Sequence, residues 1–295
     1  MFSQPLTPAR ERPIAPRVST PAGGTPWTRR ALLGVSIGWV FLVTPWLLIS
    51  LPWAIGLLPQ IAIHLVLVYA VLRPNNGWLG PVVTRFEPSR PDAREVWLTI
   101  DDGPDGEDNP RLLALLEAAG ARATFFLRGD RARGCPQAVR EIVRRGHTIG
   151  NHTDTHSAQR FWMLGPRGLA REIDGAAETL AHFADEGNDG SVRRLFRPPV
   201  GMQNVFLWPL LRARGLQLIG WSARGFDGVN WPQATETVAR ILRDVQPGAI
   251  ILLHEGVRGR GGEPLNVIGL ELLLDALRER GYAAVIPRAE QFQTR

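Results

Sequence analysis

The stretch Val96–Pro104, VWLTIDDGP, joins an apolar run to two adjacent carboxylates and a Gly-Pro pair. The apolar run is typical of a buried strand, and Gly-Pro is typical of the turn that ends one. Carboxylates at the end of a buried strand are costly unless something binds them, although they could instead cap the next helix in a solvated turn. On a strand, Asp101 and Asp102 would point to opposite faces. We therefore expect them to have different roles and to make a poor acid/base pair for a glycosidase.

Similar short apolar runs alternate with amphipathic stretches along the rest of the chain. The predicted strands are Val96–Ile100, Ala123–Leu127, His147–Gly150, Leu195–Arg197, Leu216–Trp221, Ala249–Leu253 and Ala283–Ile286. The predicted helices include Asn109–Ala119, Gln137–Arg145, Leu169–Ala184, Thr235–Asp244 and Leu270–Arg280. Seven such alternations predict an α/β fold with a parallel sheet, open or closed into a barrel. We favour a barrel because polar residues end several strands, where barrels carry their catalytic groups.

A pair of histidines follows the predicted strand that begins at His147, in the sequence NHTDTH at residues 151–156. If the chain is helical here, His152 and His156 share one face of the helix. Two imidazoles and a carboxylate at the end of a strand suit a catalytic zinc with an open coordination position. We expect the other histidines, His64, His147 and His182, to be structural.

Two further strand ends carry candidate catalytic groups. In the sequence FRPPVG at 196–201, two prolines fix the backbone, and the N–H groups of Val200 and Gly201 become candidates for holding an oxyanion. Arg197 could orient a carboxylate. The apolar run IILLHE at 250–255 ends at His254, which could protonate a leaving amine.

Together these motifs resemble those of the polysaccharide deacetylase family, also called the NodB-homology family or carbohydrate esterase family 4. Residues 99–104 (TIDDGP) look like its T-F-D-D-G-P motif, and residues 152–156 match H-[ST]-x-x-H. Residues 197–200 resemble R-x-P-[YF], and residues 252–254 match L-x-H. The resemblance covers about residues 95–288, and the four motifs stand in the family's order.

The resemblance implies a distorted (β/α)7 barrel that holds one divalent metal ion at the carboxyl ends of its strands. Zinc is the expected ion, and other divalent ions are compatible. The implied metal ligands are Asp102, His152 and His156. The implied catalytic groups are Asp101 as general base, Arg197 beside it, the Val200 backbone N–H at the oxyanion, and His254 as general acid.

One motif departs from the family's pattern. The family has D-x-x-D-W before its last motif, whereas this chain has RGFDG at 224–228 after Trp221. Asp227 matches the second acid, whose implied task is to orient His254. Arg224 replaces the first acid and Gly228 replaces the tryptophan, which puts the usual glycan groove in doubt. Arg224 and Trp221 could bind an anionic substrate such as a sugar phosphate, or Arg224 could simply be solvated.

The net charge of +6 and the pI near 10.9 could suggest a nucleic acid as partner. The excess of arginine lies before Pro91, however, and residues 91–295 carry 26 arginines against 26 acids, so nucleic-acid binding is not expected. All basic residues are arginine, which excludes a P-loop lysine and a Schiff-base lysine. Cys135 is alone, so the chain has no internal disulfide.

The amino-terminal third predicts a membrane anchor. Ala31–Leu72 contains no charged residue and is long enough for two helices with a turn near residues 50–52. The alternatives are a monotopic hairpin, a cleaved signal peptide or a weak twin-arginine signal at Arg29 and Arg30. The expected domains are a disordered basic tail (1–28), a transmembrane hairpin (29–73), a linker (74–94) and the deacetylase domain (95–295). By the positive-inside rule, the catalytic domain would face the cytoplasm from the inner membrane, with a periplasmic orientation as the alternative.

The resulting prediction is a metal-dependent hydrolase that removes an N-acyl group, acetyl or formyl, from an amino sugar of a glycan or lipid-linked saccharide. The alternative is a non-catalytic, membrane-anchored module that binds carbohydrate and keeps the barrel. The expected partners are the sugar substrate and the lipid bilayer, with no nucleic acid and no obligate protein partner.

Overall fold

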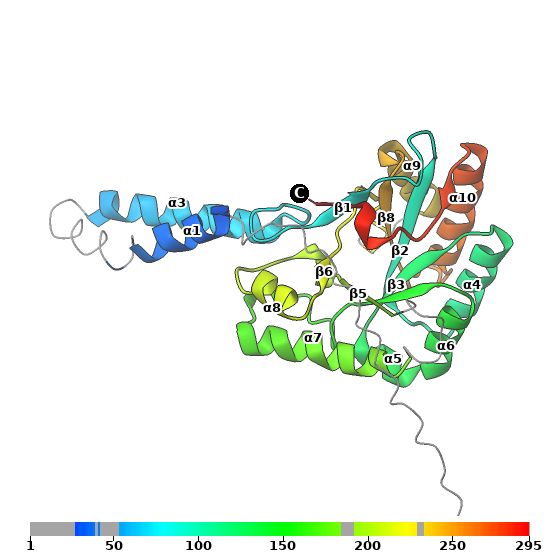
Figure 1. Cartoon of the computed structure of the whole chain (residues 1–295), viewed down its shortest axis with the longest axis horizontal. Coiled ribbons are helices and arrows are strands. Elements are labelled where there is room, and N and C mark those ends of the chain that lie inside the picture. Colours follow the sequence, from blue (N-terminus) through cyan, green and yellow to red (C-terminus); the bar gives the residue numbers. More distant parts are fainter. Residues whose placement is uncertain (1–26, 39–40, 42–52, 184–191, 229–232, 295) are drawn as a thin grey trace, which may run out of the picture.

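The computed structural model describes residues 27–38, 41, 53–183, 192–228 and 233–294, in which strands and helices alternate (Figure 1). The strands are β1 (Val83–Phe86), β2 (Glu95–Gly103), β3 (Ala123–Leu127), β4 (Thr148–Asn151), β5 (Val192–Phe196), β6 (Gln217–Leu218), β7 (Ala223–Arg224), β8 (Ala249–His254), β9 (Ala283–Ala284) and β10 (Phe292–Thr294). The α-helices are α1 (Trp27–Gly38), α3 (Trp53–Leu72), α4 (Asn109–Ala118), α5 (Gly129–Gly134), α6 (Pro136–Arg144), α7 (Pro166–Ala181), α8 (Leu207–Ala213), α9 (Ala234–Asp244) and α10 (Leu265–Glu279). Short 3₁₀ turns are η2 (Phe161–Met163), η3 (Pro199–Gly201) and η4 (Ala289–Gln291).

Strand β2 lies in the middle of a curled, largely parallel sheet. It pairs in parallel with β3 on one side and β8 on the other, and β4, β5 and β6 continue in parallel beyond β3. At the opposite end, β1 pairs antiparallel with β8 and β10. The sheet curls until Ile219, just after β6, bridges to Val83 of β1, and β7 then pairs with β8. The predicted α/β fold is therefore confirmed as a curled half-barrel whose parallel strands end on one side.

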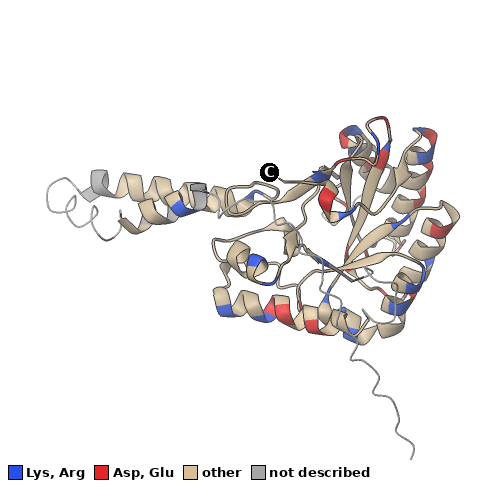
Figure 2. Cartoon of the chain, viewed as in Figure 1, with Lys and Arg blue, Asp and Glu red and all other residues tan. Residues whose placement is uncertain are grey.

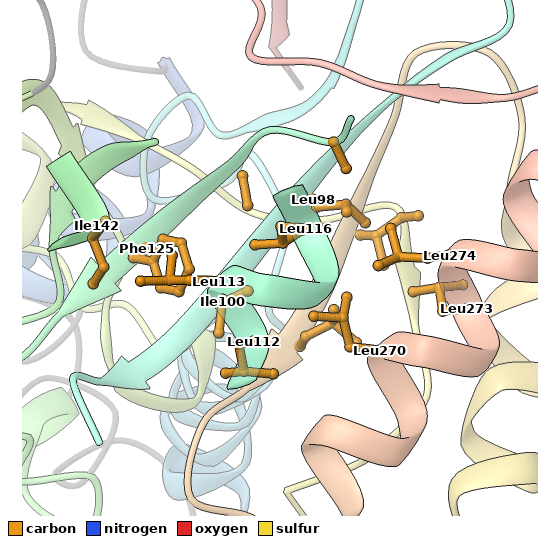
Figure 3. Packing of buried hydrophobic residues seen from close by; sticks show 14 of the residues in the cluster. Leu98, Ile100, Leu112, Leu113, Leu116, Phe125, Ile142, Leu270, Leu273 and Leu274 are labelled. Atoms are coloured by element: carbon orange, nitrogen blue, oxygen red, sulfur yellow. The ribbon is translucent and has the colours of Figure 1, made fainter. Parts of the chain in front are cut away.

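The core follows from the alternation of residues along β2. Val96, Leu98 and Ile100 belong to one buried cluster with leucines of α4 and α10. Figure 3 shows Leu98 and Ile100 directed toward these helices. Trp97, on the opposite face, packs inside the barrel with Phe126 and Ile250. Because successive side chains of a strand alternate between faces, Asp101 shares the inner face with Trp97. The sequence of β2 thus builds the helix-covered core and delivers one carboxylate to the interior.

The segment at 74–94, predicted as a linker, contains strand β1 and belongs to the sheet. Val82, Val83 and Phe86 are buried, and Phe86 N–H donates to the Gly248 carbonyl. Gly248 has a positive φ, and a Cβ there would lie 2.0 Å from the Phe86 carbonyl oxygen. Only glycine allows this approach of β1 to the start of β8. The prolines and glycines around β1 conceal this short apolar run in the sequence.

Helices α1 and α3 lie side by side and project from the half-barrel (Figure 1). Figure 2 shows how few charged residues this pair carries compared with the helices around the sheet. Among the described helices, none is both long enough and apolar enough to cross a membrane. The predicted turn near 50–52 and nearly all of the predicted tail at 1–28 lie outside the described residues, and Trp27 and Thr28 belong to α1.

Candidate active site

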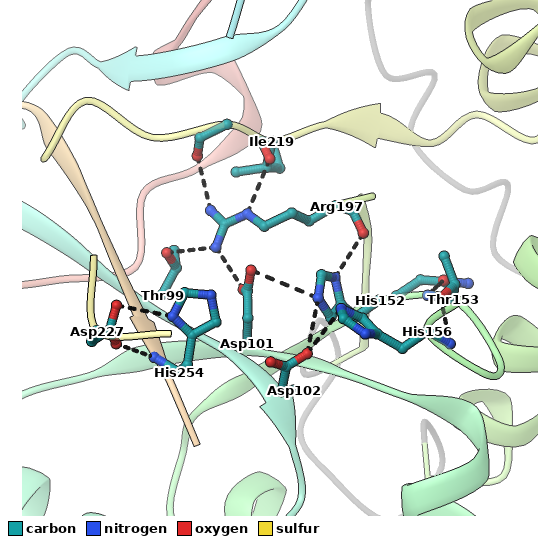
Figure 4. Close-up of polar contacts among 12 residues, drawn as sticks. Thr99, Asp101, Asp102, His152, Thr153, His156, Arg197, Ile219, Asp227 and His254 are labelled. Carbon is teal, nitrogen blue, oxygen red and sulfur yellow. Dashed lines mark hydrogen bonds and ion pairs between the residues drawn. The ribbon is translucent and has the colours of Figure 1, made fainter. Parts of the chain in front are cut away.

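The register of the parallel strands brings the predicted site residues to one end of the half-barrel. Asp101 on β2 lies opposite His254 on β8, and Asn151 on β4 lies opposite Phe196 on β5. The chain therefore places His152 beside Arg197, and the Arg197 N–H donates to the Asn151 carbonyl at 3.0 Å. Figure 4 shows the side chains of Asp101, His152, Arg197 and His254 lying close together.

Asp101 and Asp102 face the same cavity, so the expectation of opposite faces is wrong. The pairing of β2 with β3 shifts register between Asp101 and Gly103, and Asp102 adopts a left-handed backbone with a φ of 71°. A bulge of this kind re-aims a side chain, and aspartate tolerates the left-handed region better than most residues. The strand geometry consequently gives no argument against a glycosidase, which has to be judged on other grounds.

The two histidines converge through a loop, so the helix considered for residues 151–156 is wrong. Strand β4 ends at Asn151, and both Thr153 and His156 have positive φ angles, which no α-helix allows. Asn151 holds this loop, since its side chain accepts the Thr153 N–H at 2.9 Å and donates to the Ile173 carbonyl at 2.8 Å. The imidazole rings lie 4.9 Å apart. Strained backbone in such a cluster is typical of ligand-binding positions.

Asp102, His152 and His156 present ligand atoms that all lie within 4.8 Å of one another. Oδ1 of Asp102 lies 3.4 Å from Nε2 of His152 and 3.1 Å from Nε2 of His156, and it is buried without a hydrogen-bond partner among the described residues. A buried carboxylate oxygen without a partner, beside two imidazole nitrogens, fits a divalent cation. The other ring nitrogen of His152, Nδ1, lies 2.8 Å from the Arg197 carbonyl oxygen, a contact that fixes the orientation of a metal-binding imidazole.

The protonation states of these groups suit metal ligation. Burial raises the pKa of Asp102, but the imidazoles of His152 and His156 outweigh burial and hold this pKa well below its ordinary value. Burial, together with the neighbouring His152, lowers the pKa of His156 to about 4. At neutral pH the site therefore offers an ionised carboxylate and a neutral imidazole, the forms that bind a metal ion.

Arg197 is fully buried and fixes Asp101. Its Nη1 donates to Oδ1 of Asp101 at 2.7 Å and to the Thr99 hydroxyl at 2.9 Å. Its other nitrogens donate to the backbone carbonyls of Ile219 at 3.1 Å and Gly220 at 2.8 Å, and the guanidinium lies 4.2 Å from the Phe126 ring centroid. Burial lowers the pKa of Arg197, and Asp101 opposes this effect. The second oxygen of Asp101 remains near the metal-ligand cluster, 3.8 Å from His152 Nε2.

His254 and Asp227 form a pair on the opposite side of the cavity. Oδ1 of Asp227 lies 3.0 Å from Nδ1 of His254, and its Oδ2 accepts the His254 N–H at 2.8 Å. Burial lowers the pKa of His254, but the charge and hydrogen bond of Asp227 dominate and raise it to about 9. His254 therefore carries a proton at neutral pH, and Asp227 orients its ring.

The structure distinguishes between the two candidate oxyanion donors. Gly201 N–H donates to the Pro198 carbonyl at 3.0 Å, whereas Val200 N–H has no hydrogen-bond partner among the described residues. Val200 has a φ of 51°, unusual for a β-branched residue, and it lines the cavity. This leaves Val200 as the available backbone donor of the two.

The catalytic cavity has a volume of about 230 Å³ and collects all the predicted site residues except Arg197, which lies behind Asp101. Trp221 and Arg224, the predicted substrate-binding residues, both line it. The Arg224 guanidinium lies 4.1 Å from the Phe226 ring centroid and 5.7 Å from that of Trp221. A Cβ at Gly228 would lie 3.5 Å from the His254 ring, so the absence of a side chain there leaves one face of this ring open.

Three supporting residues were not identified from the sequence. Thr99 accepts a hydrogen bond from Arg197, and its position two residues before Asp101 on the same strand face was a usable signal. Asn151 holds the histidine loop and begins the NHTDTH motif. Arg131 donates to the Asp102 carbonyl at 2.9 Å, and nothing in the sequence near Asp102 indicates this contact.

Comparisons with known proteins agree with this geometry. The family model for polysaccharide deacetylase matches residues 89–219. A chitooligosaccharide deacetylase of Azorhizobium caulinodans is 30% identical over 198 residues, which cover 64% of this chain and 90% of that protein. The chain belongs to the polysaccharide deacetylase family. A second member, a peptidoglycan-N-acetylglucosamine deacetylase of Bacillus cereus, is 31% identical over 192 residues, covering 64% of this chain and 84% of that protein.

Solved structures of the same family share the fold. A peptidoglycan N-acetylglucosamine deacetylase matches with a TM-score of 0.59 and 26% identity, over 72% of this chain and 92% of that one. A family 4 carbohydrate esterase from Streptomyces lividans, in complex with acetate, matches with a TM-score of 0.57 and 28% identity, over 67% and 95% of the two chains. This member of the polysaccharide deacetylase family is thus a hydrolase of carbon–nitrogen amide bonds, as predicted, and the glycosidase alternative falls.

Proposed function

We propose that this deacetylase removes an N-acyl group from an amino sugar with the help of one divalent metal ion held by Asp102, His152 and His156. The observation that carries the proposal is the convergence of three ligand atoms within 4.8 Å beside a separate, Arg197-bound carboxylate. The mixed nitrogen and oxygen donors suit zinc. When bound, such an ion polarises the amide carbonyl and lowers the pKa of water.

The residues of the chain supply the proton transfers. Asp101, held by Arg197 on one oxygen, accepts the proton of the attacking water with the other. The Val200 N–H donates to the negative charge that develops on the carbonyl oxygen. His254 donates its proton to the departing amine, because its pKa of about 9 keeps it protonated at neutral pH. The proton acceptor, Asp101, and the proton donor, His254, are therefore both in place before the substrate binds.

The relatives support an N-acetylated amino sugar as the substrate class. Those named above act on chitooligosaccharides or on peptidoglycan N-acetylglucosamine. The proposed substrate here is an N-acetyl or N-formyl amino sugar, either in a glycan or attached to a lipid. The departures at Arg224 and Gly228 favour a substrate other than an extended neutral polymer.

We further propose that α1 and α3 attach the enzyme to the inner membrane with the catalytic domain facing the cytoplasm. Apolar side chains on α3 support attachment, since Leu58, Ile61 and Leu65 are each more than half exposed. Arginines at the two ends of this region support the cytoplasmic orientation, since Arg29 and Arg30 lie in the first turn of α1 and Arg73 and Arg85 follow α3.

Metal removal tests the proposed chemistry. The purified full chain should contain about one divalent ion, and a chelator should abolish the release of acetate from an N-acetylglucosamine oligosaccharide. Adding zinc back should restore activity. A folded protein that binds no divalent ion and releases no acetate would instead support the carbohydrate-binding module.

A further inference from the structure

A second, larger cavity adjoins the catalytic one. Its volume is about 640 Å³, within the range of small-molecule sites, and it lies where α3 meets the half-barrel. Arg73 and Tyr69 line it from the end of α3, Arg85 from β1 and Arg224 from β7. We call this space the arginine cavity.

The arginine cavity has an excess of positive charge. None of Arg73, Arg85 and Arg224 forms an ion pair with any carboxylate of the described residues, although Asp244 also lines the wall. Arg73 stacks on Tyr69 at 5.2 Å, and Arg224 packs against Phe226. Guanidinium groups that lack a carboxylate partner and rest on aromatic rings are suited to bind phosphate through paired hydrogen bonds.

The arginine cavity and the catalytic cavity share part of their walls. Trp221 and Arg224 line both. Asn75 fixes this boundary, because its side chain donates to the Trp221 carbonyl at 2.9 Å and accepts the Trp221 N–H at 3.3 Å. A phosphate bound beside Arg224 would therefore place the group attached to it at the entrance to the Asp101 site.

An apolar strip leads to the arginine cavity from the opposite direction. Its members on α3 recur every three or four residues and so lie on one helical face. They are Leu58, Ile61, Leu65, Val68 and Leu72, which are 46–63% exposed. Tyr69, the next residue after Val68, lines the cavity itself. A hydrocarbon chain laid along this strip would thus reach the arginines.

We infer that the arginine cavity binds the phosphate of a lipid-linked amino sugar, with the sugar in the catalytic cavity and the hydrocarbon chain along α3. This inference rests on the proposed function and specifies its substrate. A neutral polymer would use neither the three arginines nor the apolar strip.

Three substrates and matched variants test the inference. The substrates are farnesyl-phospho-N-acetylglucosamine, the same sugar phosphate without its lipid, and a neutral N-acetylglucosamine oligosaccharide, each assayed with the full chain in detergent micelles. Arg73→Gln removes an exposed arginine and Arg85→Gln a half-buried one. Arg212→Gln, on the exposed surface of α8, is the control.

The lipid-linked phosphate should be the preferred substrate of the wild type. In Arg73→Gln and Arg85→Gln, the ratio of its kcat/KM to that of the oligosaccharide should fall about tenfold or more, the effect of losing one charge-assisted hydrogen bond. Arg212→Gln should keep the wild-type ratio.

Two results would overturn the inference while leaving the proposed function intact. One is an unchanged ratio in both variants. The other is equal kcat/KM for the sugar phosphate with and without its lipid. If the metal-loaded wild type released no acetate from the three substrates and no formate from their N-formyl counterparts, the proposed function itself would fail.

Discussion

Asp101 and Asp102 are neighbours in the chain but have different surroundings. Asp101 is buried against the Arg197 guanidinium, whereas Asp102 faces two imidazoles and has an oxygen without a hydrogen-bond partner among the described residues. The bulge after Asp101 creates this difference, because it turns Asp102 toward the loop of His152 and His156. Two adjacent carboxylates can therefore serve as base and ligand in one cavity.

Replacing Asp101 with asparagine should separate these two roles. Asp101→Asn keeps the shape of the side chain but removes the proton acceptor, so kcat should fall by roughly 10²–10⁴-fold. The metal content should stay at the wild-type level, because Asp102, His152 and His156 are unchanged. Elemental analysis and an acetate-release assay on the same sample give both quantities. Asp92→Asn, at an exposed position, is the control, and full activity in Asp101→Asn would refute the assigned base.

The pH dependence should report His254. This residue acts while protonated, and Asp227 raises its pKa to about 9, so kcat/KM should stay level through neutral pH and fall above about pH 9. In Asp227→Asn the charge that raises the pKa is lost, so the alkaline limb should move to lower pH. A purely structural role for Asp227 would reduce activity without moving this limb. The test is a kcat/KM profile of both proteins.

The predicted site residues could be found from the sequence because they stand in short motifs at or shortly after the ends of strands. The residues that hold these side chains in place could not be found in this way, because their contacts depend on the three-dimensional path of the backbone. Phe126 and Thr99 contact Arg197 from strands β3 and β2, respectively. These contacts depend on the register between the parallel strands, which the sequence does not specify.

At the scale of elements, each of the seven predicted strands overlaps a strand of the structure, whereas the short strands β1, β7 and β10 were not predicted. Strands β2, β3 and β8 match their predictions, since each is a continuous buried run. Strand β1 was not predicted, because it has only four residues and prolines and glycines surround it. These four residues form a strand through their pairing with β8 and β10. The histidine loop was taken for a possible helix, because the i, i+4 spacing of its histidines fits a helix as well as a tight loop.

Glu255 joins two elements at the edge of the site. It is buried at the end of β8, where its two oxygens accept the Asp105 N–H at 2.9 Å and the Asn109 side-chain amide at 2.8 Å. Burial raises its pKa from 4.5 to about 7, although both hydrogen bonds oppose the shift. The folded state thus binds an additional proton over this range, so the free energy of unfolding should decrease as pH rises from about 4.5 to about 7.

Glu255→Gln should weaken that dependence on pH. Glutamine cannot ionise, so urea denaturation should give a free energy of unfolding that changes less between about pH 5 and about pH 8 than in the wild type. Glu271→Gln, exposed on α10, should keep the wild-type slope. Identical slopes for all three proteins would show that Glu255 does not control this dependence.

At the scale of the whole molecule, the apolar helix pair and the catalytic half-barrel are joined by only a short connection. Residue 72 ends α3, and β1 begins at residue 83. The catalytic cavity must therefore stay close to whatever surface α1 and α3 occupy. This short connection is the physical basis for expecting a substrate located at the membrane.

Protease accessibility tests the proposed orientation. In inside-out vesicles of the inner membrane, added protease should digest the domain at 95–295, whereas in sealed right-side-out vesicles the domain should be protected. Detergent should make it accessible in both preparations. Digestion only in right-side-out vesicles would place the domain in the periplasm and contradict the orientation derived from the arginines.

Arg197 connects the catalytic base to the closure of the sheet. One guanidinium holds the Asp101 carboxylate, the Thr99 hydroxyl and the carbonyls of Ile219 and Gly220, and Ile219 bridges to β1 where the curled sheet closes on itself. The proton acceptor consequently reaches its working position only when the two ends of the sheet have met. Ile219 lies outside the catalytic cavity, so a change that disturbs the closure of the sheet there would also disturb the alignment of the base.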